Sequence, residues 1–306
     1  MCSESIPAPT ATNTCAIVVT YNPDAEFRQR ILHVSSQFPL VFIVDNGSND
    51  SVRSMLKVLA ADPKIKLTAN STNRGIAEAL NQGMKLGLES EFEWAVTLDQ
   101  DTVVFPDLLE TLLGVHATCS GEKVLIGGNY LNINKGRHFV DGTDADNGFL
   151  ERKTLITAGT LVPLQASTHM GGFRDDYFID SVDHEFCLRA RAHGFRILIS
   201  RKPVMSQHIG TKMEVAAWWS KFASFNHSPV RKYYIARNTL VTARDYLFRE
   251  PAWSLRQVWR LLSDFASIIL FESNKHRKSS AFVAGLWDGI INKMGPLNEN
   301  RIKFWK

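Results

Sequence analysis

Short runs of apolar residues alternate with helix-like segments through the first hundred residues of this 306-residue chain. The runs are rich in β-branched residues, and they cover Cys15–Thr20, Val41–Val44, Ile65–Thr68 and Trp94–Leu98. Residues with helical periodicity fill the intervals at Ala25–Ser36, Ser51–Ala61 and Gly75–Leu88. Strands that are apolar throughout and alternate with helices are typical of a parallel sheet covered on both faces. The sequence therefore predicts an α/β fold with a mostly parallel sheet and helices on both faces.

The alternation becomes less regular beyond Asp101. We expect helices at Pro106–Cys119 and Ser181–His193, a polar loop at Asn132–Gly148, and strands at Lys123–Ile126, Thr154–Val162 and Phe195–Ser200. From about Glu214 onward the pattern predicts helices alone. These features divide the chain into a disordered leader (1–14), an α/β domain (15–212) and a helical C-terminal region (213–306).

The charge of the chain is unevenly distributed. Residues 1–200 hold 17 Lys and Arg against 24 Asp and Glu, whereas residues 201–306 hold 18 against 7. The C-terminal third thus carries a net charge of +11, which indicates an anionic partner such as nucleic acid, phospholipid or a diphosphate. A solvated lysine-rich surface is the alternative. Aromatic residues and leucines interleave with these charges and make that alternative weaker.

Cysteine usage and hydropathy exclude several classes of protein. The four cysteines are far apart and form no CxxC pair, so neither a disulfide framework nor a zinc site is expected, and a reducing compartment fits best. The first fifteen residues lack both a basic and an apolar segment, so we expect no secretory signal. The longest apolar stretches fall well short of the ~18 residues of a membrane span. We expect a soluble protein, or one that lies on a membrane surface.

Polar clusters follow three of the predicted strands, at Tyr21-Asn22, Asp45-Asn46 and Asp99-Gln100-Asp101. In parallel sheets of this kind, ligands bind beyond the carboxyl ends of the strands. Two acids that bracket one position can hold Mg²⁺ or Mn²⁺ and leave coordination sites for phosphate oxygens. Neither a GxGxxG fingerprint nor a GxxxxGK[ST] loop is present, so we expect no dinucleotide or P-loop site.

Three further residues have both a functional and a structural interpretation. Asp45 either accepts from a nucleoside or closes its strand with an Asx turn. Asp183 lies in the first turn of a predicted helix, where capping and catalysis are compatible. His208 is followed by Ile209-Gly210, and it is either a packing residue or a group that assists at a phosphate.

Taken together, these motifs resemble a known family. The segments that carry the resemblance are Val18–Asn22, Val44–Ser48, Asn73–Gly75, Leu98–Asp101, Phe178–Asp183 and His208–Gly210. In this order they resemble the inverting family-2 glycosyltransferases of the GT-A fold, over roughly residues 15–300. The DQD motif, the Phe178–Arg189 segment and Tyr233–Asn238 are similar to the bacterial rhamnosyltransferase subgroup. Many relatives have Glu-Asp where this chain has Val182-Asp183, which leaves Asp183 as the candidate base.

The resemblance implies a role for each of these positions. It implies a nucleotide-sugar donor, dTDP-L-rhamnose, and a metal cofactor, Mg²⁺ or Mn²⁺. The metal would be held by Asp101 with Asp99, and His208 would assist there and at the diphosphate. Asp183 would deprotonate the acceptor hydroxyl, and the small residues of Thr157–Thr160 would line the sugar side. The donor-binding residues would be Thr20, Tyr21, Asn22, Asp45, Asn73, Arg74, Gly75, Asp99, Gln100 and His208.

The expected acceptor is a cell-surface polysaccharide, such as an O-antigen, or a lipid-linked oligosaccharide. A nucleotidyltransferase is an alternative, although it would usually show a basic, Gly-rich loop near the first strand. A non-catalytic module that binds a nucleotide sugar is another, and it would need neither Asp101 nor Asp183. Nucleic-acid binding is the weakest, because the basic region lacks a recognisable reading motif.

The C-terminal region also suggests a location. Between Ser254 and Phe271, an apolar stripe lies opposite a polar side that includes Arg256, Gln257, Arg260 and Asp264. The stripe comprises Leu255, Val258, Trp259, Leu262, Phe265, Ala266 and Ile269. Such a helix can lie in a membrane interface, or it can pack on the α/β domain. We also expect exposed aromatic residues at Trp218, Trp219, Tyr233, Trp253, Trp259 and Trp305. Together these features predict a cytoplasmic protein, peripheral on the inner face of the cell membrane.

Overall fold

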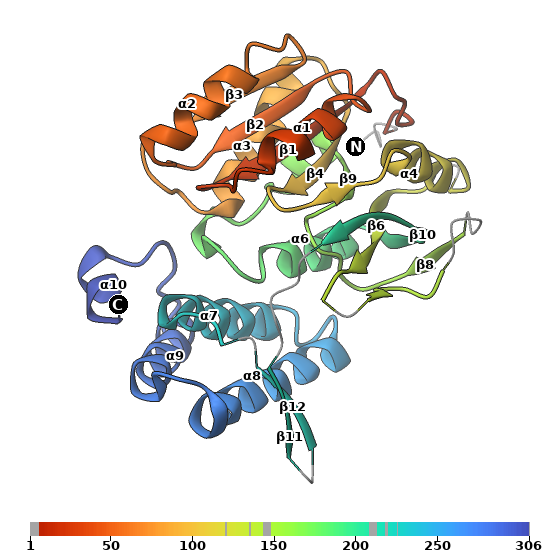
Figure 1. Cartoon of the computed structure of the whole chain (residues 1–306). Coiled ribbons are helices and arrows are strands. Elements are labelled where there is room, and N and C mark those ends of the chain that lie inside the picture. Colours follow the sequence, from red (N-terminus) through yellow and green to blue (C-terminus); the bar gives the residue numbers. More distant parts are fainter. Residues whose placement is uncertain are drawn as a thin grey trace. The chain divides into compact units, whose positions relative to one another are not determined.

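The chain divides into two units, which we describe separately (Figure 1). Unit 1 comprises Met1–Phe173 and Phe186–Ile209, and unit 2 comprises Arg174–Glu185 and Gly210–Lys306. The computed structural model describes residues 6–119, 121–134, 136–142, 148–207, 213–217, 220–224 and 226–305. In this division the second part of unit 1 ends at Ile209, whereas the sequence analysis placed the boundary of the α/β domain at residue 212. However, the segment Arg174–Glu185, which contains Asp183, belongs with the C-terminal unit.

Unit 1 is built on one large sheet with the strand order β3-β2-β1-β4-β9-β6-β10-β5. The first four strands in this order run parallel, as their apolar sequences predict, and β9 is antiparallel to both of its neighbours. The short strands β7 and β8 pair with β6 and β10. The strands are β1 Thr14–Thr20, β2 Val41–Asp45, β3 Ile65–Ala69, β4 Trp94–Asp99, β5 Val103–Val104, β6 Val124–Asn132, β7 Arg137–His138, β8 Phe149–Glu151, β9 Thr160–Pro163 and β10 Arg196–Gln207.

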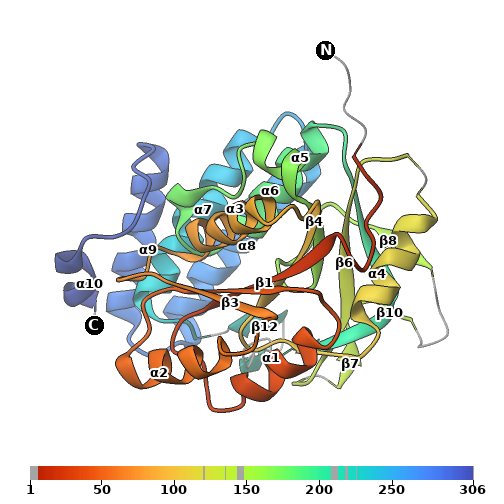
Figure 2. The same ribbon diagram turned by 90° about the horizontal axis from the view of Figure 1, so that it is seen from above.

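Helices cover both faces of this sheet (Figure 2). Ala16 and Val18 of β1 point into a core that is shared with α1, α2 and α4. Ile17 points to the opposite face, where α3 approaches so closely that a Cβ on Gly83 would lie 2.3 Å from Ile17 Cγ2. The helices are α1 Phe27–Ser35, α2 Asp50–Leu59, α3 Ile76–Glu89, α4 Leu108–Ala117 and α5 Leu164–His169; α6 Val182–Ala192 spans the division between the units. The α/β sheet with helices on both faces is thus confirmed.

Some expectations for unit 1 were wrong in detail. Residues 6–13, expected to be part of a disordered leader, instead contact the rest of unit 1. Trp94 Nε1 donates to the Pro7 carbonyl at 2.8 Å, and Ile6 packs against the core. The expected strand at Thr154–Val162 forms only over β9, because residues 157–159 form a turn in which Gly159 has a φ of +71°. The expected polar loop after Asn132 contains β7.

Unit 2 is mainly helical, as expected, but it also contains a hairpin. The strands β11 Met213–Ala217 and β12 Ser220–Ser224 pair antiparallel where the sequence predicted helices alone. The helices are α7 Pro229–Asp245, α8 Pro251–Phe271, α9 Lys275–Ile290 and α10 Glu299–Trp305. The Ser228 side chain caps α7 by accepting from the Arg231 amide, and Pro229 follows at the first turn. In the described part of the chain, no helix combines the length and the hydropathy that crossing a membrane requires.

The helices α7 and α9 pack closely because α9 presents two glycines to α7. A Cβ on Gly285 would lie 2.3 Å from the Tyr233 carbonyl oxygen, and one on Gly289 would lie 3.2 Å from the Arg237 carbonyl oxygen. Only glycine at position 285 allows the two backbones to approach this closely. The backbones of α7 and α9 are therefore in close contact at these two positions.

Candidate active site

The loops that follow β1, β2 and β4 are joined to one another at the carboxyl edge of the sheet. Gln100 Oε1 accepts from the Tyr21 amide at 2.7 Å, and Ser48 Oγ accepts from the Asn22 amide at 2.7 Å. Asn22 has a φ of +46°, a conformation that asparagine tolerates better than most residues, and its Oδ1 accepts from the Asn49 amide at 2.9 Å. The structure thus brings together the strand-end clusters that the sequence singled out, and it leaves the Tyr21 ring about half exposed.

Asp45 is fully buried at this edge. Its Oδ1 accepts from the hydroxyl groups of Thr20, at 3.0 Å, and Ser48, and its Oδ2 accepts from the Ser48 amide at 3.1 Å. These are the bonds of a turn that closes a strand, which is the structural interpretation of this residue. A buried carboxylate in this position fixes the loop that presents Asn46 and Ser48.

The predicted segment Asn73-Arg74-Gly75 joins the same edge through Asn46. Asn46 Nδ2 donates to Asn73 Oδ1 at 3.1 Å and to the Gly75 carbonyl at 2.9 Å, and Asn46 Oδ1 accepts from the Arg74 amide at 3.0 Å. Gly47 permits this contact because a Cβ there would lie 2.7–2.9 Å from the backbone of residues 72 and 73. The Arg74 side chain is exposed and pairs with Glu78 at 2.6 Å.

The two acids of the DQD motif have different surroundings. Asp99 Oδ2 accepts from Gln207 Nε2 at 3.3 Å, and Asp99 Oδ1 accepts from the Thr157 hydroxyl at 3.5 Å. Asp101 is half-buried, and within the described ranges no side chain or backbone group hydrogen-bonds or pairs with its carboxylate. Asp101 is therefore the acid of the motif that is available to a ligand.

Two buried oxygen atoms near this motif have no hydrogen-bond partner. They are Oε1 of Gln207, whose amide nitrogen binds Asp99, and Oγ1 of Thr102, which follows Asp101. Carboxylate and amide oxygens are the ligands that Mg²⁺ and Mn²⁺ prefer, so the residues present fit a hard divalent cation. The described residues contain no group of three His, Cys, Asp or Glu that could hold a metal by themselves. His208 lies outside the described residues.

Asp183, the predicted base, lies at the start of α6 and is assigned to unit 2. Its Oδ1 accepts from the His184 amide at 2.8 Å, as an acid in the first turn of a helix commonly does. The preceding turn has an unusual backbone, because Phe178, Asp180 and Ser181 all have positive φ values of 60–65°. Such values cost energy in residues other than glycine and persist only where surrounding contacts impose them.

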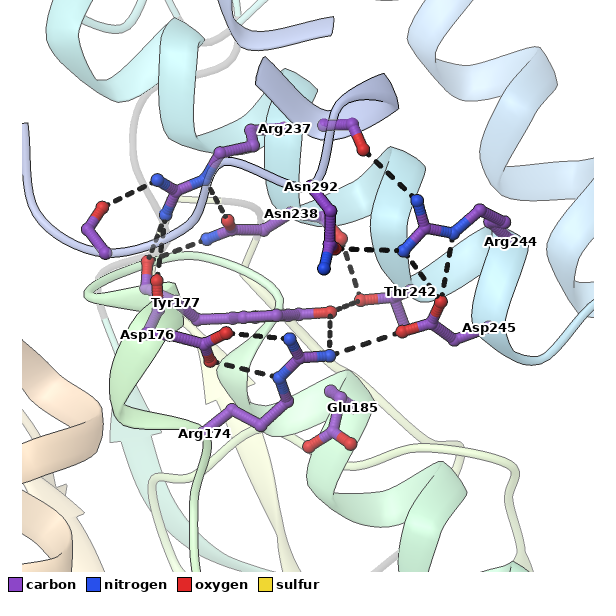
Figure 3. A network of polar contacts seen from close by, with 12 residues as sticks. Arg174, Asp176, Tyr177, Glu185, Arg237, Asn238, Thr242, Arg244, Asp245 and Asn292 are labelled. Atoms are coloured by element: carbon purple, nitrogen blue, oxygen red, sulfur yellow. Dashed lines mark hydrogen bonds and ion pairs between the residues drawn. The ribbon is translucent and has the colours of Figure 1, made fainter. Parts of the chain in front are cut away.

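The contacts that impose this turn come from α7 (Figure 3). The buried Asn238 Nδ2 lies 2.8 Å from the Tyr177 carbonyl, 2.7 Å from the Ile179 carbonyl and 3.0 Å from the Asp180 carbonyl, and it donates to all three. Arg237 donates to the carbonyls of Asp176, at 3.1 Å, and Tyr177, at 3.3 Å. The motif Tyr233–Asn238, which the sequence associated with a subgroup but not with a role, thus positions the segment that precedes Asp183.

Asp180 is the nearest alternative to Asp183 as a base, and its carboxylate is engaged. The Arg231 guanidinium donates to Asp180 Oδ1 at 3.1 Å and 3.2 Å and to Oδ2 at 3.3 Å. Burial raises the pKa of Asp180 above its usual range, the charge of Asp183 raises it further, and Arg231 opposes both effects. Arg231 thus binds both carboxylate oxygens of Asp180.

A pocket of about 350 Å³ lies at the opposite edge of the sheet. Its lining includes Glu93, Lys123 and Phe195, which directly precede the parallel strands β4, β6 and β10. None of the residues predicted for the active site lines this pocket. Ligands of such sheets bind at the carboxyl ends, so this pocket is not the candidate active site.

Sequence reasoning missed Gln207, gave Thr157 a different role at the sugar side, and gave Asn238 no role of its own. Gln207 and Thr157 hold Asp99, and Asn238 holds the turn before Asp183. Gln207 could have been predicted from its position, because it is a polar residue directly before His208. No local pattern indicates Asn238, because its partners are 58–61 positions earlier in the chain.

Solved structures share this fold. The crystal structure of S. aureus TarS 1–349 matches with a TM-score of 0.61 at 14% identity, over 92% of this chain and 82% of that one. The same TarS fragment in complex with UDP-GlcNAc matches with a TM-score of 0.59 at 16% identity, over 91% and 81%. GalNAc-T7 with UDP, GalNAc and Mn²⁺ gives 0.50 at 11% identity, over 64% and 43%. The fold is that of the GT-A glycosyltransferases.

The chain belongs to glycosyl transferase family 2, whose family model matches residues 15–179. It is also 28% identical over 297 residues to the dTDP-rhamnosyl transferase RfbF of Shigella flexneri, covering 91% of this chain and 96% of that protein. The expected family and fold are thus confirmed, and the protein is a glycosyltransferase. Membership of this family decides against a nucleotidyltransferase and against a non-catalytic module.

Proposed function

We propose that this protein is an inverting glycosyltransferase that moves L-rhamnose from dTDP-L-rhamnose to a hydroxyl group of a glycan. The likeness to a dTDP-rhamnosyl transferase along almost the whole of both chains supports the donor. The acceptor is a cell-surface polysaccharide, such as an O-antigen, or a lipid-linked oligosaccharide. The observation that carries the proposal is the carboxylate of Asp101, which has no partner in the described part of the chain and follows a strand at the carboxyl edge of the sheet.

The donor binds at the loops joined at that edge. The half-exposed Tyr21 ring packs against the pyrimidine, with Asn22 beside it, and the turn at Asp45 fixes the loop that faces the nucleoside. Thr20 and Gln100 support Asp45 and Tyr21, and the segment Asn73-Arg74-Gly75 lines the same pocket. The guanidinium of Arg74 adds a positive charge close to an anionic ligand.

Asp101, together with Asp99, holds Mg²⁺ or Mn²⁺. Such an ion supplies positive charge to the diphosphate as it leaves. The orientation of Asp99 depends on the contacts that Gln207 and Thr157 make with it. His208 is proposed as a further ligand or as a donor to the diphosphate.

Asp183 takes the proton from the acceptor hydroxyl. The acceptor oxygen then attacks the anomeric carbon, the bond from that carbon to the diphosphate oxygen breaks, and the configuration is inverted. The nucleoside diphosphate leaves with the electron pair of the broken bond. We place this reaction at the inner face of the cell membrane, where a lipid-linked acceptor is accessible.

A panel of nucleotide sugars tests the donor. Thermal unfolding is measured with dTDP-L-rhamnose, other dTDP sugars, UDP sugars and GDP sugars, each with Mn²⁺, Mg²⁺ or EDTA. We expect the largest stabilisation from dTDP-L-rhamnose with metal, because a ligand that binds only the folded state raises its apparent stability. Asp101→Ala should lose the part of this stabilisation that depends on the metal, whereas Glu110→Ala, which changes an exposed acid on α4, should keep it. Equal stabilisation in EDTA would contradict the role of the metal.

A second pair of variants tests the base. Asp183→Asn keeps the size and the hydrogen bond to the helix but cannot accept a proton, so sugar transfer should fall by about 10²–10⁴-fold. The thermal shift caused by the donor should stay as in the wild type. Asp180→Asn changes the acid that pairs with Arg231, and its rate of sugar transfer should fall less than that of Asp183→Asn. Transfer by Asp183→Asn within a few-fold of the wild type would show that another group is the base.

A further inference from the structure

Helix α8 is packed with its apolar stripe outward. Leu255, Trp259 and Leu262 are 64%, 69% and 59% exposed, and Ile269, two turns further on, is 47% exposed. Several polar residues of the same helix are buried, with Ser254 at 0%, Gln257 at 4% and Ser267 at 2%, alongside the apolar Leu261 and Ile268. An amphipathic helix of a globular protein normally does the reverse. Much of the apolar stripe is therefore not used for packing within unit 2.

Ion pairs fix α8 in this orientation. Asp264, on the inner side, pairs with Nζ of Lys232 on α7 at 2.5 Å. Lys232 also pairs with Glu272, directly after α8, at 2.8 Å, and Glu272 pairs with Lys278 at 2.8 Å. Lys232 and Glu272 are each 1% exposed, so a rotation of α8 would break buried pairs. The outward stripe is thus a property of the packing of unit 2.

The charges around the stripe all have one sign. Between Pro251 and Lys293 the only acids are Asp264, Glu272 and Asp288, and each of them is buried or half-buried in an ion pair. The exposed charged residues of the same stretch are all basic, namely Arg256, Arg260, Lys275, Arg277 and Lys293. Helix α9 has exposed apolar residues as well, at Val283, Trp287 and Ile290.

We propose that the outward face of α8 docks on an anionic lipid bilayer. Leu255, Trp259 and Leu262 enter the boundary between headgroups and acyl chains, and Arg256 and Arg260 meet the lipid phosphates. This proposal names the surface that brings the enzyme to the membrane, but it does not depend on the proposed reaction.

A second copy of the chain fits this face less well. A symmetric contact would place Arg256 and Arg260 of one copy near the same arginines of the other. The stretch from Pro251 to Lys293 offers no exposed acid to compensate them. Charge complementarity therefore favours an anionic surface that is not protein.

Three of the aromatic residues expected at this surface do not contribute to it. Tyr233, Trp253 and Trp305 are at most 5% exposed, because they pack inside unit 2, where Tyr233 contacts Trp305 and Trp253 contacts His184. Trp218 and Trp219 lie outside the described residues. The exposed aromatic residues on α8 and α9 are Trp259, as expected, and Trp287.

The test is sedimentation of the full chain with vesicles, in the absence of any nucleotide sugar. Vesicles of phosphatidylcholine with about 30 mol% of the anionic lipid phosphatidylglycerol are compared with vesicles of pure phosphatidylcholine, each at low and at high salt. We expect binding to the anionic vesicles at low salt, weaker binding at high salt, and little binding to pure phosphatidylcholine. Arg256→Gln and Arg260→Gln should each weaken binding about fivefold.

Matched variants locate the surface. Trp259→Glu with Leu262→Glu should abolish vesicle binding, whereas Val58→Glu, at an equally exposed apolar position on α2, should not change it. Arg28→Gln with Lys57→Gln removes two exposed charges from unit 1 and should have little effect. Asp101→Ala and Asp183→Asn should bind vesicles as the wild type does, which separates docking from catalysis.

Three outcomes would overturn the proposal. One is the absence of binding to anionic vesicles at low salt. Another is unchanged binding by the Trp259→Glu, Leu262→Glu variant. The third is a wild-type dimer that this double variant dissociates, since the face would then be an interface between two copies of the chain.

Discussion

The two units bury different kinds of side chain. In unit 1 the inner strands are apolar and inaccessible, as at Ala16, Phe42 and Ile43. In unit 2 the inaccessible residues include Lys232 and Arg237, while Trp259 is exposed. Hydropathy therefore accounts for most of the burial in the sheet, whereas burial in the helical unit also depends on polar partners, which are Asp264 and Glu272 for Lys232 and backbone carbonyls for Arg237. A sequence pattern can show the first but not the second.

The largest expected effect concerns the buried ion pairs of unit 2. Lys232→Met removes a cation that pairs with both Asp264 and Glu272, and it leaves acidic groups buried without full compensation. Breaking a buried pair from one side costs about 3–5 kcal/mol. We expect the free energy of unfolding, measured by urea denaturation, to fall by this amount.

An exposed pair on the same unit serves as the control. Lys303 pairs with Glu299 at 3.5 Å on α10, where both side chains are largely exposed. Lys303→Met should change the free energy of unfolding by less than about 0.5 kcal/mol, as is usual for surface pairs. If the two lysine variants lost similar amounts, charged partners would not determine the packing of unit 2.

The sheet of unit 1 could be predicted because its signals are local. Four parallel strands and the helices between them followed from apolar runs and helical periodicity, and each lies within a few residues of its expected bounds. The short strands β5, β7 and β8 could not be predicted, because they hold two or three residues each and form only where a longer strand offers an edge. The hairpin of β11 and β12 was missed for a different reason, since its two strands pair only with each other and the sequence there predicted helices alone.

The candidate site could be predicted only in part. The polar clusters at Tyr21, Asp45 and Asp99 were found because the carboxyl ends of parallel strands share one edge. Asp45 binds Thr20 and Ser48, whereas the carboxylate of Asp101 has no partner among the described residues, and no sequence pattern shows this difference. Tyr233, Trp253 and Trp305 were expected at the surface, because a pattern of aromatic and basic residues does not show which side of a helix is covered.

A smaller effect is expected from the buried amide of Asn238. Asn238→Ala leaves three carbonyl groups without their donor, which should lower the free energy of unfolding by about 1–3 kcal/mol. Because these carbonyls shape the turn before Asp183, we also expect kcat to fall while the KM for the donor stays nearly unchanged.

Two further variants separate positioning from general stability. Asn238→Asp keeps the shape of the side chain but has no N–H donors, so its kcat should fall as in Asn238→Ala. Asn292→Gly, at an exposed asparagine that accepts from Arg244 and whose φ of +57° glycine also adopts, should change neither quantity appreciably. A normal kcat in Asn238→Asp would contradict the role of the amide.

The smallest effect concerns pH and His227, which lies beside the buried charges of unit 2. The pKa of this imidazole is lowered from 6.5 to about 4, first by burial and then by the charges of Arg231, Lys232 and Lys278, while Glu272 opposes them. The unfolded chain therefore binds a proton between pH 6.5 and pH 4 that the folded chain refuses, so stability from this group is complete above pH 6.5 and is lost as the pH falls toward 4. Because the side chain is only half-buried, we expect this group to lower the free energy of unfolding by less than about 1 kcal/mol at pH 5.

Urea denaturation at pH 7 and pH 5 measures this effect. The free energy of unfolding of His227→Gln should depend less on pH than that of the wild type, whereas that of the exposed His33→Gln should depend on pH as the wild type does. Burial raises the pKa values of Asp180 and Asp264, so these carboxylates contribute a pH dependence of the opposite sign. Their contribution is the same in the wild type and in His227→Gln, and it cancels when the two proteins are compared. An unchanged pH dependence in His227→Gln would mean that this imidazole is as well hydrated as one on the surface of unit 1.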